Sequence, residues 1–160
     1  AAMLKAVEIA HAAQREVAFT LSESVCIAGR REGFAQMIDG GGIDLLFANQ
    51  DEVLQLTGRS DPDSALTELA AKVKTLVVTR GADGATAISH GERISIPAAP
   101  VSQVVDTTGA GDLFAAGFLA ARAKSLSLER CLWTGAIAAG EVIQHYGARP
   151  IADLKTLVQL

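Results

Sequence analysis

The stretch from Asp106 to Leu119 constrains this chain more than any other. It begins as the polar turn Asp-Thr-Thr-Gly-Ala-Gly-Asp and passes into apolar residues that recur about every 3.6 positions, namely Leu113, Phe114, Gly117, Phe118 and Ala121. The sequence therefore predicts a glycine loop that leads into the N-terminus of a helix. The first amides of a helix have no partner within it, and glycine lets a ligand approach the backbone closely. Such a place binds anions.

An acidic residue, Asp112, stands where a simple phosphate loop would carry Lys, Arg or no charge. A carboxylate next to a phosphate is repelled by it, so this position indicates proton transfer. The helix dipole favours the ionised carboxylate by roughly 0.3 to 1 kcal/mol. An ionised carboxylate that faces an alcohol can act as general base for attack on a phosphoryl group, which contributes about 10² to 10⁴ in rate. The loop amides would stabilise charge on the transferred group.

The order Asp-Thr-Thr-Gly-Ala-Gly-Asp-x-x-x-Ala-Gly, from Asp106 to Gly117, closely resembles the C-terminal motif of the ribokinase-like (PfkB) carbohydrate and nucleoside kinases. The resemblance implies that Asp112 is the catalytic base and that the amides of Gly109, Ala110 and Gly111 form the anion hole. The alternative is an ordinary helix N-terminus with an acidic first turn. The length and fixed spacing of the match favour the kinase.

The resemblance covers nearly all of the 160 residues. Members of the family are longer, and their N-terminal half carries most acceptor-binding residues and a small β-lid. We therefore expect residues 1–160 to form the C-terminal part of a ribokinase-like kinase domain. The expected fold class is α/β, a three-layer α/β/α arrangement with a mostly parallel sheet and without the lid, and the alternation of predicted strands and helices indicates the same class. Such a part alone is expected to be inactive, because its site would not exclude water.

The motif Asn49-Gln50-Asp51-Glu52 follows an apolar strand predicted at residues 43–48. As structure, Asn49 is a helix N-cap and Glu52 completes a capping box. As function, Asn-x-x-Glu resembles the family motif that organises Mg²⁺ and its waters near the ATP phosphates, a role that suits a carboxylate because Mg²⁺ dehydrates reluctantly. We expect both interpretations to hold.

Two glycine turns are candidates for the nucleotide. The strand predicted at residues 75–79 ends in Thr-Arg-Gly-Ala-Asp-Gly, and glycines after a strand are ordinary turn residues. The pattern also resembles the family's nucleotide-binding turn, which implies that Thr79, Gly81 and Gly84 lie near ATP. Gly147 and Ala148, after the helix predicted from Leu128, resemble the adenine-side loop.

Asp106 matches the aspartate that helps to hold a monovalent cation in many family members. Nucleoside-preferring relatives often do not need this cation, so the resemblance does not decide whether this protein binds one.

The remaining elements follow from local patterns. The sequence predicts a helix at 3–14, a strand at 17–20, a helix at about 26–38, a helix from Asn49 to Thr57, a helix opened by Asp61, a hairpin at 85–89 and 92–96, a helix capped by Ser127, and a closing helix at 152–160.

Composition excludes several classes of protein. The formal net charge is −4, and no basic stretch could neutralise several phosphates, which argues against nucleic acid as a partner. No apolar run approaches the roughly 18 to 20 residues that span a bilayer, and the N-terminus lacks the order of a signal peptide. We therefore expect a soluble, cytoplasmic protein. Cys26 and Cys131 lack metal-ligand spacing and are expected to be buried thiols in a reducing compartment.

The resemblance to the ribokinase-like kinases implies an ATP-dependent phosphotransferase that acts on a primary hydroxyl of a sugar or nucleoside. Residues 45–52 and 138–150 most resemble adenosine-kinase-like members, which favours adenosine. Alternatives are another PfkB sugar kinase, of the ribose or fructose type, and a non-catalytic nucleotide-binding domain. The sequence also does not decide whether the full-length protein forms a homodimer. A dinucleotide-dependent oxidoreductase fits poorly, because Gly-x-Gly-x-x-Gly would need a glycine where Phe114 stands.

Overall fold

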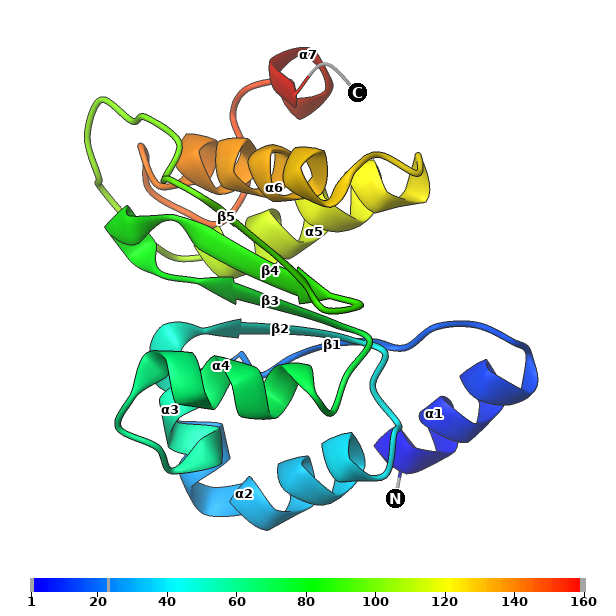
Figure 1. The fold of residues 1–160 in the computed structure, drawn as a ribbon. Coiled ribbons are helices and arrows are strands. Elements are labelled where there is room, and N and C mark those ends of the chain that lie inside the picture. Colours follow the sequence, from blue (N-terminus) through cyan, green and yellow to red (C-terminus); the bar gives the residue numbers. More distant parts are fainter. Residues whose placement is uncertain (1, 23, 159–160) are drawn as a thin grey trace. The chain divides into compact units, whose positions relative to one another are not determined.

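The computed structural model describes residues 2–22 and 24–158, with the side chains of residues 24–28 and 30 left aside (Figure 1). Five strands form one sheet in the order β1-β2-β3-β4-β5. Their bounds are β1 Ala18–Thr20, β2 Leu45–Asn49, β3 Thr75–Thr79, β4 Ala85–Ser89 and β5 Glu92–Ile96. β1 and β2 are parallel, with Ala18 opposite Leu45. The predicted α/β class with a mostly parallel sheet is confirmed.

The chain divides into two compact units. Unit 1 comprises residues 1–78 and 88–93, and unit 2 comprises residues 79–87 and 94–160. The helices of unit 1 are α1 Ala2–Ala12, α2 Ser24–Asp39, α3 Gln50–Thr57 and α4 Pro62–Ala70. Those of unit 2 are the 3₁₀ turn η1 Gly81–Asp83, α5 Ala110–Ala123, α6 Leu128–Val142 and α7 Leu154–Val158.

In unit 1 a hydrophobic core joins β2 and β3 to α2, α3 and α4, and α3 and α4 lie on one face of β2 and β3 in Figure 1. The first four residues of β2 and of β3 are all buried, as expected for strands that are covered on both faces. The helix ends follow local chemistry. Asp61 accepts a hydrogen bond from Ser64 N–H at 2.8 Å and caps α4, and Gly58 ends α3 with φ 73°.

In unit 2 the helices α5 and α6 pack closely through small residues. A Cβ on Gly117 would lie 2.7 Å from the carbonyl oxygen of Thr134, and a Cβ on Gly135 would lie 2.7 Å from that of Phe114. These glycines therefore let the two backbones touch. Ser127 caps α6 by accepting from Arg130 N–H at 3.3 Å. Within the described residues, no helix is long and apolar enough to cross a membrane.

Several predicted bounds were wrong by a few residues. α1 ends at Ala12 rather than 14, and α2 begins at Ser24. α7 begins at Leu154 rather than 152, because Asp153 caps it by accepting from Lys155 N–H at 3.0 Å and from the Thr156 hydroxyl at 3.1 Å. The predicted burial of Cys131 is confirmed. That of Cys26 falls outside the described side chains.

Candidate active site

The helix α5 begins at a glycine in the left-handed conformation. Gly109 has φ 81° and ψ −1°, which residues with a Cβ rarely adopt. A Cβ on Gly109 would also lie 2.7 Å from the Cβ of Ala148. The N–H of Ala110 donates to the carbonyl oxygen of Thr107 at 3.1 Å, so the loop turns directly into the helix. The predicted glycine loop at a helix N-terminus is confirmed.

The next two amides, of Gly111 and Asp112, have no acceptor among the residues that the structure describes. A Cβ on Gly111 would meet no atom within 4 Å, so the space beside this backbone is open. The Asp112 side chain is exposed and lies in the first turn of α5. One helical turn thus presents open N–H groups together with an accessible carboxylate.

Asp106 fastens this loop. Its Oδ1 accepts from Thr108 N–H at 2.9 Å, and its Oδ2 accepts from Gly147 N–H at 3.1 Å. The hydrogen bonds from Thr108 and then from Gly147 lower the pKa of Asp106. The carboxylate therefore joins the start of the glycine loop to the segment with Gly147 and Ala148, which lies 41 residues further along the chain. Carboxylate oxygens have further lone pairs, so these bonds leave room for a cation.

The predicted nucleotide turn is also formed. β3 ends at Thr79, and Arg80 N–H donates to the carbonyl oxygen of Gly84 at 2.8 Å. Gly81 and Gly84 have φ of 57° and 88°. A Cβ on Gly84 would overlap the carbonyl oxygen of Ile96, so the fold itself requires glycine there, whereas a Cβ on Gly81 would meet nothing within 4 Å. The contact of this turn with a nucleotide stays a prediction.

The capping box that Asn49 and Glu52 form in unit 1 is confirmed. The Asn49 side chain accepts from Glu52 N–H at 2.8 Å, and Glu52 Oε2 accepts from Asn49 N–H at 2.9 Å. The Glu52 side chain is buried, and burial raises its pKa, an effect that the Asn49 N–H reduces and the nearby Asp51 carboxylate increases.

The same two residues fit Mg²⁺ held through water. Mg²⁺ keeps several waters and takes one or two carboxylates, and the capping box engages only one Glu52 oxygen among the described contacts. A cation nearby would offset the raised pKa by favouring the ionised carboxylate. Across residues 2–22 and 24–158, no group of three or more His, Cys, Asp and Glu could hold a metal directly.

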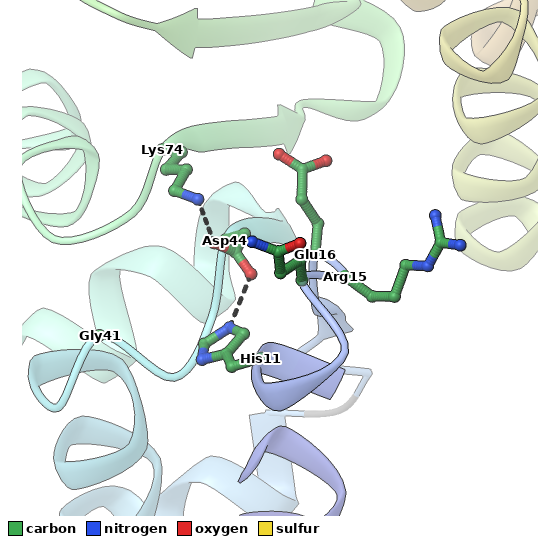
Figure 2. A pocket seen from close by; sticks show the side chains of 7 residues that line it. His11, Arg15, Glu16, Gly41, Asp44 and Lys74 are labelled. Carbon is green, nitrogen blue, oxygen red and sulfur yellow. Dashed lines mark hydrogen bonds and ion pairs between the residues drawn. The ribbon is translucent and has the colours of Figure 1, made fainter. Parts of the chain in front are cut away.

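Figure 2 shows a pocket of unit 1 that the sequence did not predict. It is lined by His11, Gln14, Arg15, Glu16, Gly41, Asp44 and Lys74. The buried Asp44 carboxylate lies at its centre and accepts from His11 Nε2 at 3.0 Å, from Val17 N–H at 2.8 Å and from Lys74 Nζ at 2.7 Å. The pocket lies where β2 and β3 begin, whereas open α/β sheets bind ligands where parallel strands end. Asp44 therefore has a structural role.

A sequence signal for this cluster exists. Asp44 is the only charged residue in the apolar run of residues 43–48, and a charge in a buried strand needs partners. Its partners come from α1 and from the start of β3, so their identity depends on the fold.

The predicted site residues fall into three groups. The first group lies in unit 2, where Asp106 binds Gly147 and Gly109 packs against Ala148. Gly111 and Asp112 follow Gly109 in the first turn of α5. The turn from Thr79 to Gly84 is a second group in unit 2, and the capping box belongs to unit 1.

A mostly parallel α/β sheet with a glycine loop at a helix N-terminus defines the class of phosphate-binding α/β proteins. The model of the family described as pfkB family carbohydrate kinase matches residues 2–155. The chain belongs to this family.

Relatives agree with this assignment. Adenosine kinase from Sinorhizobium meliloti is 43% identical, with a TM-score of 0.95 over 99% of this chain and 48% of that one. Ribokinase from Arabidopsis thaliana is 34% identical over 92% of this chain and 44% of its own length. The structure of that ribokinase complexed with ribose and ATP has a TM-score of 0.79 and 27% identity over 98% of this chain and 51% of that one. The chain thus spans about half the length of these relatives.

Proposed function

We propose that this chain forms the phosphoryl-transfer part of an ATP-dependent kinase that phosphorylates a primary hydroxyl of a nucleoside or sugar. One observation carries the proposal: an exposed Asp112 stands beside the open amides of Gly111 and Asp112, directly after the left-handed Gly109. A carboxylate and N–H donors thus share one helical turn, which supports the proposal that Asp112 is the base. Family membership supports it, because the relatives named above are kinases of ribose and adenosine.

In the proposed mechanism, Asp112 accepts the proton of the acceptor hydroxyl as its oxygen attacks the γ-phosphorus of ATP. The bond between the γ-phosphorus and the bridging oxygen breaks, and ADP leaves with that electron pair. The proposed anion hole consists of the amides of Gly109, Ala110 and Gly111, and the Ala110 N–H exchanges its bond to the Thr107 carbonyl oxygen for one to the transferred group. These amides donate to oxygens that carry more charge in the transition state than in the substrate. Positioning and electrostatics supply the catalysis.

The nucleotide is assigned to the two glycine turns. Thr79, Gly81 and Gly84 line the phosphates and ribose, and Gly147 and Ala148 line the adenine side. Asn49 and Glu52 hold the waters of Mg²⁺, which supplies neutralisation of the phosphate charge when it is bound. Asp106 holds the glycine loop through its two backbone hydrogen bonds and keeps lone pairs for a monovalent cation.

Adenosine is the favoured acceptor. In structural alignments that cover nearly the whole chain, the 43% identity to adenosine kinase from Sinorhizobium meliloti exceeds the 27% identity to ribokinase from Arabidopsis thaliana. A sugar of the ribose or fructose type is the second candidate, which the ribokinase match supports. The full-length protein is proposed to act in the cytoplasm.

The test is an acceptor panel with the complete gene product. ADP release is measured with ATP and Mg²⁺ and with adenosine, cytidine, ribose or fructose, and ATP binding is followed by calorimetry. We expect adenosine to give the highest kcat/KM. ATP binding without turnover of any acceptor would favour a non-catalytic nucleotide-binding domain, and a higher kcat/KM for ribose would contradict the nucleoside assignment.

A further inference from the structure

A buried carboxylate, Glu141, lies in the last turn of α6 and is not part of the proposed catalytic set. Its side chain is 10% exposed. Its Oε1 accepts from Ile151 N–H at 2.9 Å and from Ala152 N–H at 2.8 Å, and it lies 3.3 Å from Nε2 of His145. One oxygen thus holds two successive backbone groups of the segment that follows α6.

The ionised form of Glu141 suits these contacts. Burial alone would raise its pKa, and the hydrogen bonds from Ala152, Ile151 and His145 outweigh burial, so the pKa lies below its ordinary value. Hydrogen bonds to an ionised acceptor are stronger than neutral ones. The other oxygen, Oε2, is buried without a hydrogen-bond partner in the described part of the chain, so the side chain is fixed mainly through Oε1.

The segment from Gly147 to Ala152 is therefore fastened at both ends by acidic side chains. Asp106 accepts from its first residue, Gly147, and Glu141 accepts from Ile151 and Ala152. The side chains of Ile151 and Ala152 are exposed, so they contribute little packing that could hold the segment in place. The two carboxylates are its main attachments.

This segment touches the glycine loop. Ala148 lies so close to Gly109 that a Cβ on Gly109 would come within 2.7 Å of it. A displacement of the segment would therefore move Ala148 against or away from the loop that precedes Asp112. Because packed backbones transmit such shifts, the anchor at Glu141 acts on Gly147 and Ala148, the residues assigned to the adenine side.

We propose that Glu141 is a positioning residue that sets the affinity for ATP by fixing the segment 147–152. The inference rests on the proposed function, because it assigns this segment to the nucleotide. Glu141 does not touch the reacting atoms. Its removal weakens ATP binding by letting the segment move, while the acceptor side and the proton transfer at Asp112 are left in place.

The experiment compares the complete wild-type protein with E141A, E141Q and the control E129A. Glu129 lies on the first turn of the same helix and is exposed, so its removal tests a general effect of losing an acid from α6. We expect E141A to raise the KM for ATP about tenfold, which corresponds to about 1.4 kcal/mol. We expect E141Q to raise it less, because its amide oxygen still accepts from the backbone. The kcat and the KM for the acceptor should change less than twofold to threefold, and E129A should match wild type.

A further variant, Ala152→Pro, removes one of the two backbone donors without touching α6 and decides the matter if E141A does not fold. An unchanged KM for ATP in E141A, or in Ala152→Pro where E141A is unfolded, would overturn the inference even if both lose thermal stability. A fall in kcat with unchanged KM for ATP would also overturn it. A wild-type protein that neither binds nor consumes ATP would instead refute the proposed function. The two failures are therefore distinguishable, because the variants test the inference and the wild type tests the proposed function.

Discussion

Replacing Asp44 with asparagine should remove the pH dependence that one buried carboxylate gives to the stability of unit 1. Burial alone would raise the pKa of Asp44, but the hydrogen bonds from Lys74, Val17 N–H and His11 outweigh it and lower the pKa from 3.8 to about 2. A group whose pKa is lower in the folded state stabilises the fold when it is ionised. Its contribution is fully present above pH 3.8 and is lost as the pH falls toward 2.

The magnitude follows from the difference between the two pKa values. One pKa unit corresponds to about 1.4 kcal/mol, so the shift from 3.8 to about 2 contributes about 2 kcal/mol to the free energy of unfolding at neutral pH. The Asp44 residue is only 5% exposed, so solvent screens these contacts little. Asp44→Asn keeps the shape but loses the charge that Lys74 faces at 2.7 Å.

The assay is denaturant unfolding of wild type and Asp44→Asn at pH values from 7 to 2. The two free energies should differ by about 2 kcal/mol at pH 7 and come together only as the pH falls to about 2, where the wild-type carboxyl takes up its proton in the folded state. The control is Asp63→Asn, which removes an exposed ion pair with Arg93 and should change the free energy by less than about 1 kcal/mol. Parallel pH profiles for wild type and Asp44→Asn would refute the reasoning.

Three further predictions concern other parts of the chain. Gly117→Ala should lower the free energy of unfolding by about 1 to 3 kcal/mol, because the new Cβ meets the Thr134 carbonyl at 2.7 Å, whereas Gly33→Ala in α2, with nothing within 4 Å, should not; equal melting temperatures would contradict this. Asn49→Ala should lower the free energy of unfolding by about 1 kcal/mol through loss of the helix cap, and Asn49→Asp should retain the cap. If both variants show a weaker dependence of activity on Mg²⁺, Asn49 acts on the metal separately from capping. An unchanged dependence on Mg²⁺ would show that Asn49 has no role at the metal. The Cys131 thiol, buried and with its pKa raised by burial, should react with a thiol reagent much more slowly in the native than in the unfolded protein, and comparable rates would show that the α6 core opens readily.

Local chemistry made much of the fold predictable. The caps at Asn49, Asp61 and Ser127 and the left-handed stop at Gly58 depend on residues within a few positions of each other, and the structure forms all four. The burial of β2 and β3 was equally predictable, because a continuous run of apolar residues indicates a strand that is covered on both faces. The nucleotide turn and the glycine loop were recognisable from spacing, although what they bind stays a prediction.

Long-range partners were not predictable from spacing. Asp106 bonds to Gly147, which is 41 residues away, and Asp44 bonds to His11, which is 33 residues away. The fold alone brings these pairs together. Glu141 accepts from Ile151, ten residues further along the chain, and no helix pattern indicates such a partner.

The measurement that tests the central claim most directly is the kinetics of Asp112→Asn in the complete protein, with ATP affinity determined in parallel. If Asp112 is the general base, kcat should fall by about 10² to 10⁴ while the affinity for ATP stays close to that of wild type. A loss of less than tenfold, with the same ATP affinity, would contradict the account, because some other group would then have to take the proton.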